Sequence, residues 1–173
     1  MPSSRTTIEW TFEDPQVELR LRPLREHWEA RGPGMLRYMC KQLPWLDLPE
    51  HVRVHLVLPT VSGGGGELKD GHIEFEAVLA NPYPTLPEVV RLAWLILRYA
   101  VSTDQENALA LIPVSVEAGE YVELTKLDNS TVELAMNKWI GNSERTGESM
   151  LRWWKQQQQA ETNWQTWNEL ELP

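Results

Sequence analysis

Three short segments that alternate between apolar and polar residues place the strongest constraint on the fold. In each of them the apolar side chains occupy every second position, as around Ile8, Val54 and Phe75. A period of two is typical of β-strands that bury one face and expose the other to solvent. The three segments are residues 7–13, 51–58 and 71–80.

The second and third segments are separated by glycines that favour a turn. The loop contains Gly63–Gly66 and Asp70-Gly71, and such residues commonly join two antiparallel strands. We therefore predict a small, mainly antiparallel three-stranded sheet in which these two strands form a hairpin. The four consecutive glycines are interpreted as its flexible tip, because no Gly-Lys-Ser/Thr pattern of a phosphate-binding loop follows them.

Helical patterns account for most of the remaining chain. The most apolar one, residues 85–101, should be the central helix of the core. An earlier helix should begin at Asp14 and be interrupted at Pro23. It should end at Gly32-Pro33-Gly34, ahead of another helix over residues 35–43. Because strands with one apolar face need a cover, we expect a two-layer α+β fold with about five or six helices packed on one face of the sheet.

The length of 173 residues fits a single domain with a short appendage. A polar segment from Asn142 to Glu148 separates the last predicted helix from the body before it. We therefore predict an α+β core domain over residues 1–141, followed by a hinge and a tryptophan-rich helix over residues 142–173. That helix could pack on the core or on a partner, and the sequence leaves both open.

The charge pattern disfavours several classes of partner. The net charge is −9, and the longest basic cluster, Arg20, Arg22 and Arg25, is interleaved with glutamates, so nucleic acid is a disfavoured partner. Residues 86–101 are too few to span a bilayer, and residues 1–7 carry no apolar run typical of a signal peptide. We accordingly expect a soluble, cytoplasmic protein with no membrane partner.

No motif in the sequence indicates a reaction class. The serine-nucleophile pattern G-x-S-x-G and the zinc-protease pattern H-E-x-x-H are both missing. Cys40 is the only cysteine, so an intramolecular disulfide and a cysteine-based zinc site are excluded. We expect no catalytic residue, no resident metal and no cofactor, and the prediction leans against an enzyme without excluding one.

The best candidates for a ligand or metal site lie on the polar face of the predicted hairpin. Imidazole and carboxylate groups that meet across two strands can bind a metal or transfer protons. The competing interpretation is a solvated face whose ion pairs each contribute less than about 1 kcal/mol. The candidate residues are His55, His72, Glu74 and Glu76.

Tryptophan is unusually abundant, with nine residues in the chain. Buried aromatic side chains contribute large desolvated areas to protein interfaces. Our leading hypothesis is a non-catalytic protein-interaction domain that forms a homodimer, or binds another protein, through an aromatic surface at the C-terminus. The alternative is an enzyme or metal-dependent small-molecule binder that uses the polar sheet face. The C-terminal tryptophans of this surface are Trp153, Trp154, Trp164 and Trp167.

Overall fold

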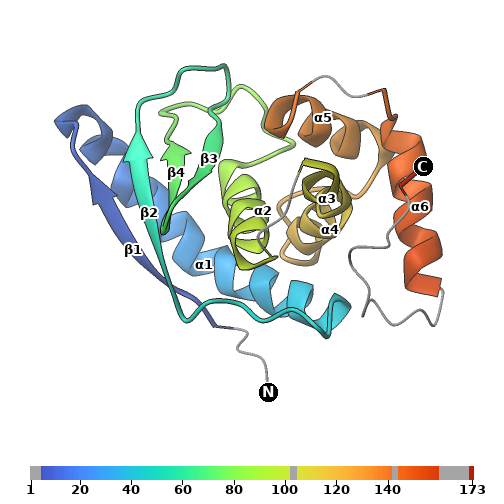
Figure 1. Cartoon of the computed structure of the whole chain (residues 1–173). Helices are drawn as coiled ribbons and strands as arrows, with labels where there is room; N and C mark the ends of the chain where they lie inside the picture. Colours follow the sequence, from blue (N-terminus) through green and yellow to red (C-terminus); the bar gives the residue numbers. More distant parts are fainter. Residues whose placement is uncertain (1–4, 102–104, 142–143, 160–171) are drawn as a thin grey trace.

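The computed structural model describes residues 5–101, 105–141, 144–159 and 172–173 of the chain. Over these residues it is an α+β fold in which a four-stranded mixed sheet lies beside six α-helices and one short 3₁₀ helix (Figure 1). The α+β class and the expected number of helices are confirmed. In chain order the elements are β1 (Thr7–Phe12), η1 (Pro15–Val17), α1 (Glu18–Gln42), β2 (His51–Val57), β3 (Gly66–Lys69), β4 (His72–Glu76), α2 (Glu88–Val101), α3 (Gln105–Ala110), α4 (Ile112–Tyr121), α5 (Asn129–Trp139) and α6 (Gly147–Gln159).

The sheet has the strand order β1-β2-β4-β3 and is mostly parallel. β1 pairs with β2, and β2 with β4, in parallel, whereas β3 runs antiparallel to β4. The predicted antiparallel hairpin of β2 and β4 is therefore wrong, as is the prediction of three strands. The Asp70-Gly71 turn does close a hairpin, with Gly71 at φ 79°, but it joins β3 to β4. The sequence pattern concealed β3 because its four residues bury no side chain.

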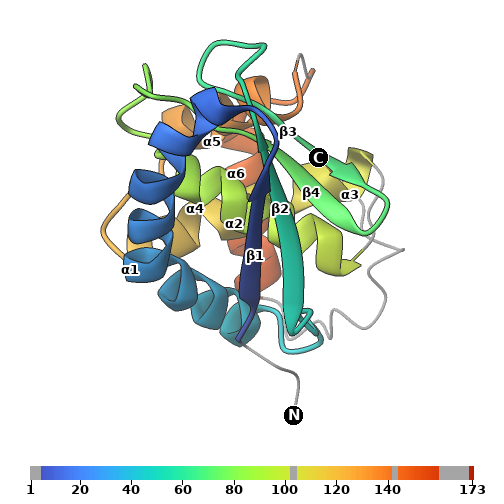
Figure 2. The same ribbon diagram turned by 90° about the vertical axis from the view of Figure 1, so that its left-hand side faces the viewer.

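One face of the sheet carries the apolar residues of the alternating strands. Val54 and Phe75 are fully buried there, and half-buried Ile8 is aligned with Val52 on the same face. Helix α2 contacts β3 and β4, and Figure 2 shows α2 and α6 behind the sheet and α1 beside β1. The opposite face of β2 and β4 is polar and faces solvent. The sheet therefore has one face covered by helices and one solvent-facing side, as expected.

Helix α2 lies at the centre of the core, as its sequence predicts. Residues 89–97 are all buried, including the charged side chain of Arg91. The guanidinium of Arg91 stacks over the Phe75 ring at 4.3 Å from its centroid. It donates hydrogen bonds to the backbone oxygens of Gly63 (2.6 Å) and Glu76 (2.7 Å), so it fixes the glycine-rich loop to the end of β4.

Helix α1 is continuous over 25 residues and contains both Pro23 and Pro33, so the predicted break and the predicted end are wrong. Asp14 is the predicted cap, and its carboxylate accepts from the N–H of Gln16 (2.9 Å) at the start of η1. Each proline removes one helical N–H and leaves the carbonyl four residues earlier without its donor. Those carbonyls belong to Leu19 and Glu29, which are both exposed residues.

The last described helix, α6, packs against α4 and α5. Its residues Met150, Leu151, Trp153 and Trp154 are buried. The division into residues 1–141 and residues 142–173 stays a prediction. Across the part of the chain that the structure describes, no helix combines the length and the apolar character that a membrane crossing requires.

Candidate functional site

The polar candidates of the central strands lie on the open face of the sheet. His55 of β2 is aligned with Glu74 of β4, and the His55 and His72 rings meet edge to face with centroids 6.2 Å apart. Thr11 of β1 joins them, because its Oγ1 lies 2.8 Å from His55 Nδ1. A shallow hollow of about 350 Å³ lies over these groups. Its lining residues are Thr11, Phe12, Glu13, Arg53, His55 and His72.

Glu76 has a different environment from the other candidates. Its carboxylate accepts hydrogen bonds from the backbone N–H of Thr60, from Thr60 Oγ1 (3.0 Å) and from the N–H of Val61 (3.3 Å). The side chain therefore anchors the loop after β2. Among the described residues, no three His, Cys, Asp or Glu side chains are grouped so that they could hold a metal ion.

The C-terminal tryptophans divide into two pairs. Trp153 and Trp154 of α6 are 5% and 1% exposed, so their rings lie within the chain's own core. Trp154 Nε1 donates to Glu117 Oε2 at 2.7 Å. Trp164 and Trp167 lie outside the described residues. The first pair therefore offers almost no exposed ring for a partner.

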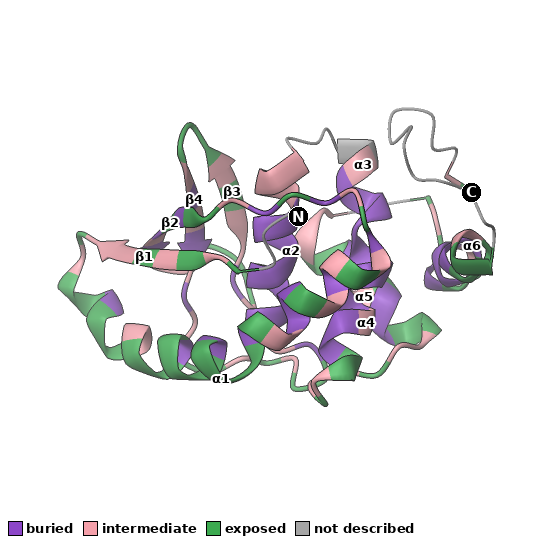
Figure 3. Cartoon of the chain, turned by 90° about the horizontal axis from the view of Figure 1, so that it is seen from below, coloured by how far each residue is buried: buried purple, intermediate pink, exposed green. Residues whose placement is uncertain are grey.

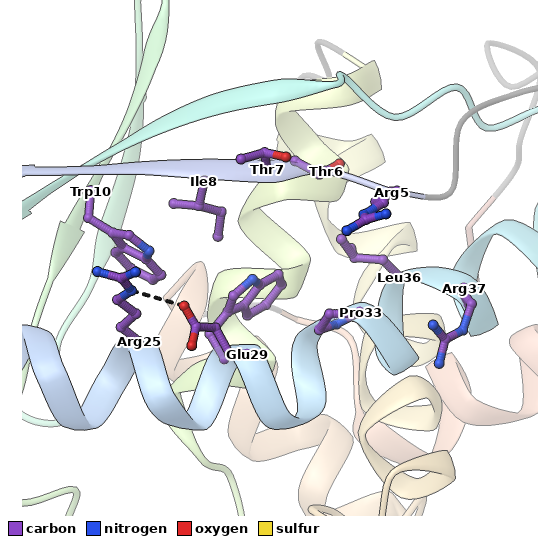
Figure 4. Close-up of a pocket in the computed structure, with 11 residues that line it drawn as sticks. Arg5, Thr6, Thr7, Ile8, Trp10, Arg25, Glu29, Pro33, Leu36 and Arg37 are labelled. Carbon is purple, nitrogen blue, oxygen red and sulfur yellow. Dashed lines mark hydrogen bonds and ion pairs between the residues drawn. The ribbon is translucent and has the colours of Figure 1, made fainter.

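A larger hollow lies between β1 and α1, where the sequence indicated no site. It encloses about 600 Å³, and Figure 4 shows side chains from both elements pointing into it. Its lining residues are Arg5, Thr6, Thr7, Ile8, Trp10, Arg25, Trp28, Glu29, Pro33, Leu36 and Arg37. We call this hollow the β1–α1 cleft.

Aromatic and aliphatic side chains form the inner surface of the β1–α1 cleft. Trp28 and Leu36 of α1 are buried at 4% and 1% exposure, and Ile8 and Trp10 of β1 are half-buried. Gly32 allows Trp28 to lie against the helix, because a Cβ at this glycine would come within 2.3 Å of the indole ring. A glycine and a proline inside a helix weaken it, and here they lie where the cleft is formed.

Three arginines surround the apolar surface of the cleft. Arg5, Arg25 and Arg37 are exposed, and Glu29 is the single carboxylate in the lining. Arg25 Nε lies 2.9 Å from Glu29 Oε1, in a pair whose side chains are 57% and 60% exposed. Such an exposed pair is weak and exchanges readily with other partners. The cleft is thus locally positive on a chain whose net charge is −9.

The described lining of the cleft contains no histidine, cysteine or serine, and its other reactive groups are two threonine hydroxyls and the exposed carboxylate of Glu29. Indole rings and guanidinium groups are instead the side chains most enriched in the energetic centres of protein interfaces. The arrangement suits a partner that brings apolar groups and carboxylates together.

The sequence contained part of the signal for this site. The alternation around Ile8 and Trp10 correctly predicted a strand with one apolar face. The position of β1 at the sheet edge and the continuation of α1 through Pro33 depend on tertiary packing, so the cleft between them could not be predicted. Figure 3 shows that the outer side of α1 consists mainly of exposed residues.

Comparisons of the chain with protein-family models, with curated proteins and with solved structures found no match.

Proposed function

We propose that this chain is a non-catalytic protein-interaction domain and that the β1–α1 cleft is its binding surface. The observation that carries the proposal is one hollow of about 600 Å³ that combines two tryptophan rings with three arginines. Ligand sites typically enclose about 300–1,000 Å³ and contain a few polar groups around an apolar surface. The aromatic surface of the interaction hypothesis thereby moves from the C-terminus to Trp10, whose ring is half-buried, with the buried Trp28 behind it.

The shape of the concave surface favours a polypeptide over a compact small molecule. A second hollow of about 440 Å³ runs along the N-terminal half of α1. It shares Arg25 and Glu29 with the β1–α1 cleft, so the two hollows lie next to each other along α1. Open, adjacent hollows of this kind accommodate an extended segment, whereas small ligands usually occupy enclosed sites.

Selection from a random peptide library displayed on phage tests this proposal. The full chain serves as the target, and enriched peptides are measured again on an Arg25→Glu/Arg37→Glu variant. Arg53→Glu is the matched control, because Arg53 is similarly exposed at 54% and also pairs with a glutamate, Glu9, but on the open sheet face. We expect the enriched peptides to bind the wild type and the control. They should not bind the double variant. Equal binding to all three chains, or no enrichment, would contradict the proposal.

Self-association through the C-terminal tryptophans is a separate proposal. Since Trp153 and Trp154 are buried within the chain, Trp164 and Trp167 are the pair to test. Light scattering of the full chain and of a Trp164→Ser/Trp167→Ser variant compares their masses over a range of concentrations. A dimer that the substitutions dissociate supports the proposal, and a wild-type chain that is monomeric throughout rejects it.

A metal-dependent or catalytic function of the open sheet face is the second candidate. The edge-to-face contact of His55 and His72, next to Glu74, is the observation that favours it. Metal analysis of the purified chain, with His55→Ala as the control, tests this candidate. A bound transition metal that the substitution removes supports it, and a chain without stoichiometric metal after incubation with zinc contradicts it.

A further inference from the structure

Among the described residues no strand pairs with the outer edge of β1, and this edge runs beside the β1–α1 cleft. β1 is the outermost strand, and the N–H of Thr7 donates to Glu50 O (2.8 Å) on the β2 side. Since alternate residues of a parallel strand bond to the same neighbour, the odd-numbered residues of β1 face β2. The even-numbered ones, Ile8, Trp10 and Phe12, therefore direct their N–H and C=O groups away from the sheet. Figure 2 shows α1 running along this side of β1.

Several of the devices that usually prevent strand addition are absent from this edge. Free edges are commonly blunted by prolines, by bulges, by charged side chains that point toward the core, or by a helix that covers the edge. The six residues of β1 include no proline and no glycine, and their inward-facing side chains are all apolar. Its pairing with β2 is regular from Thr7 to Phe12. α1 runs along the same side of β1, and the hollow of about 600 Å³ between the two elements is the space for an additional strand.

The spacing of the arginines matches an extended chain. Arg25 and Arg37 are twelve residues apart in α1, which places them roughly 18 Å apart along the helix axis. Two carboxylates six residues apart on an extended strand are separated by roughly 20 Å. Both arginines line the cleft, and Figure 4 shows Trp10 of β1 directed toward Arg25 of α1.

We propose that the partner is an extended segment of another protein that adds to β1 as a fifth strand. This inference rests on the function proposed for the β1–α1 cleft. Two carboxylates of the segment, six residues apart, pair with Arg25 and Arg37, and its apolar side chains pack against the half-buried Ile8 and Trp10. Backbone hydrogen bonds to Ile8 and Trp10 supply the pairing, and the charges select an acidic partner over a basic one.

A peptide of defined sequence tests the inference on the full chain. The probe is acetyl-Glu-Thr-Leu-Thr-Leu-Thr-Glu-amide, whose glutamates and leucines lie on one face of an extended strand. Three related peptides accompany it: one with lysine for both glutamates, and two that are N-methylated on alternate residues, one on the odd and one on the even positions. Binding is measured by calorimetry up to about 1 mM peptide, and amide hydrogen exchange is measured by NMR.

Strand addition predicts a specific pattern of results. The acidic peptide binds, the lysine peptide does not, and one of the two N-methylated peptides loses binding while the other keeps it. Exchange of the Ile8 and Trp10 amides slows by at least about tenfold when the acidic peptide is bound, because these N–H groups gain acceptors. Arg25→Glu and Arg37→Glu each weaken binding about tenfold, and Arg53→Glu changes it less than about twofold.

Three outcomes would overturn the inference. The first is a failure of the acidic peptide to bind, in which case the phage selection decides separately whether the cleft binds any polypeptide. The second is binding that both N-methylated peptides retain and that leaves the Ile8 and Trp10 amides unprotected, since the cleft would then bind without strand pairing. The third is protection of these amides in a dimer of the free chain, since a second copy would then occupy the edge.

Discussion

The indole Nε1 of Trp154 donates a hydrogen bond to Glu117 Oε2 at 2.7 Å, and this contact ties α6 to α4. Gln158 Nε2 also donates to both carboxylate oxygens, at 3.0 and 2.9 Å. Tyr38 of α1 lies close enough to be affected: burial raises the pKa of its phenol, and the charge of Glu117 adds to that effect. One carboxylate of α4 therefore bonds to α6 and lies close to Tyr38 of α1.

Removal of this carboxylate should destabilise the whole fold. In Glu117→Ala the Trp154 indole, which is 1% exposed, loses the acceptor that it has in the wild type. A buried polar group without its partner costs about 1–3 kcal/mol, so we expect the free energy of unfolding to fall by that amount. Urea denaturation followed by tryptophan fluorescence measures the change.

The matched control for this prediction is Glu26→Ala. Glu26 pairs with Arg22 at 2.9 Å, but the two side chains are 64% and 88% exposed. Exposed pairs of this kind contribute less than about 1 kcal/mol. If Glu117→Ala and Glu26→Ala have the same effect, the contact of α6 with Glu117 does not stabilise the fold.

Gly32 should resist replacement by alanine although it lies in a helix. Alanine normally stabilises a helix by about 1 kcal/mol relative to glycine. Here its Cβ would come within 2.3 Å of the Trp28 ring, so the ring must move and the β1–α1 cleft must change shape. We expect Gly32→Ala to lower the free energy of unfolding by about 1 kcal/mol or more. Urea denaturation and near-ultraviolet circular dichroism measure both effects.

Gly34→Ala is the control within the same helix. Its Cβ would meet only Val122 Cγ1, at 2.9 Å, and a valine methyl group can shift more easily than an indole ring. We expect this variant to unfold within about 0.5 kcal/mol of the wild type, since the gain in helix propensity offsets the contact. A Gly32→Ala chain as stable as Gly34→Ala would show that Trp28 has free space around it.

The glycine-rich loop provides a third prediction. Gly64 has φ +78°, and a Cβ there would lie 2.7 Å from Glu76 O and 2.8 Å from Arg91 Nη1. Gly71 has nearly the same φ, +79°, but a Cβ there would meet nothing within 4 Å. Backbone strain alone costs about 1–2 kcal/mol, so we expect that loss for Gly71→Ala and at least about 1 kcal/mol more for Gly64→Ala.

Thermal and urea denaturation of the two alanine variants measure this difference. Equal losses would mean that the loop moves away from Arg91 at little cost, and they would support the interpretation of the tetraglycine as a flexible tip. A larger loss of unfolding free energy in Gly64→Ala would instead support a loop that is fixed by the guanidinium of Arg91.

The sequence pattern predicts the buried faces of individual strands and helices, but it does not predict how these elements are arranged in the fold. The alternation around Val54 and Phe75 predicted strands with the correct buried face, and the apolar pattern of residues 85–101 predicted the central helix, because burial imposes these periods directly on the chain. Strand order carries no such signal. β3 was missed because Leu68 is its only large apolar residue and is only half-buried.

The site was predicted less well than the fold. Proximity of His55, His72 and Glu74 was expected from their strands, although the pairing is parallel and the hollow above them is shallow. The β1–α1 cleft depends on Pro33 remaining inside a helix, which runs against local propensity. Only the packing of α1 on its neighbours overrides that propensity, and packing between distant segments is not readable from one sequence.

The carboxyl group of Glu88 should give the fold a measurable pH dependence. Burial raises the pKa of Glu88 above its ordinary value of 4.5, and the charge of Arg91 and the N–H of Val78 oppose that rise. Between the two pKa values the native state binds more protons than the unfolded chain. The contribution of Glu88 to the free energy of unfolding is therefore fully present below about pH 4.5 and is lost as the pH rises through the folded-state pKa.

Glu88→Gln removes this titration while it keeps a side chain of similar size. We expect the difference in free energy of unfolding between wild type and variant to shift in favour of the wild type as the pH falls from about 7 to about 4.5. Urea denaturation at several pH values measures that difference directly, and titrations elsewhere in the chain cancel because both proteins share them. A difference that stays constant, or that shifts toward the variant at low pH, would mean that the ion pair with Arg91 at 3.8 Å outweighs burial.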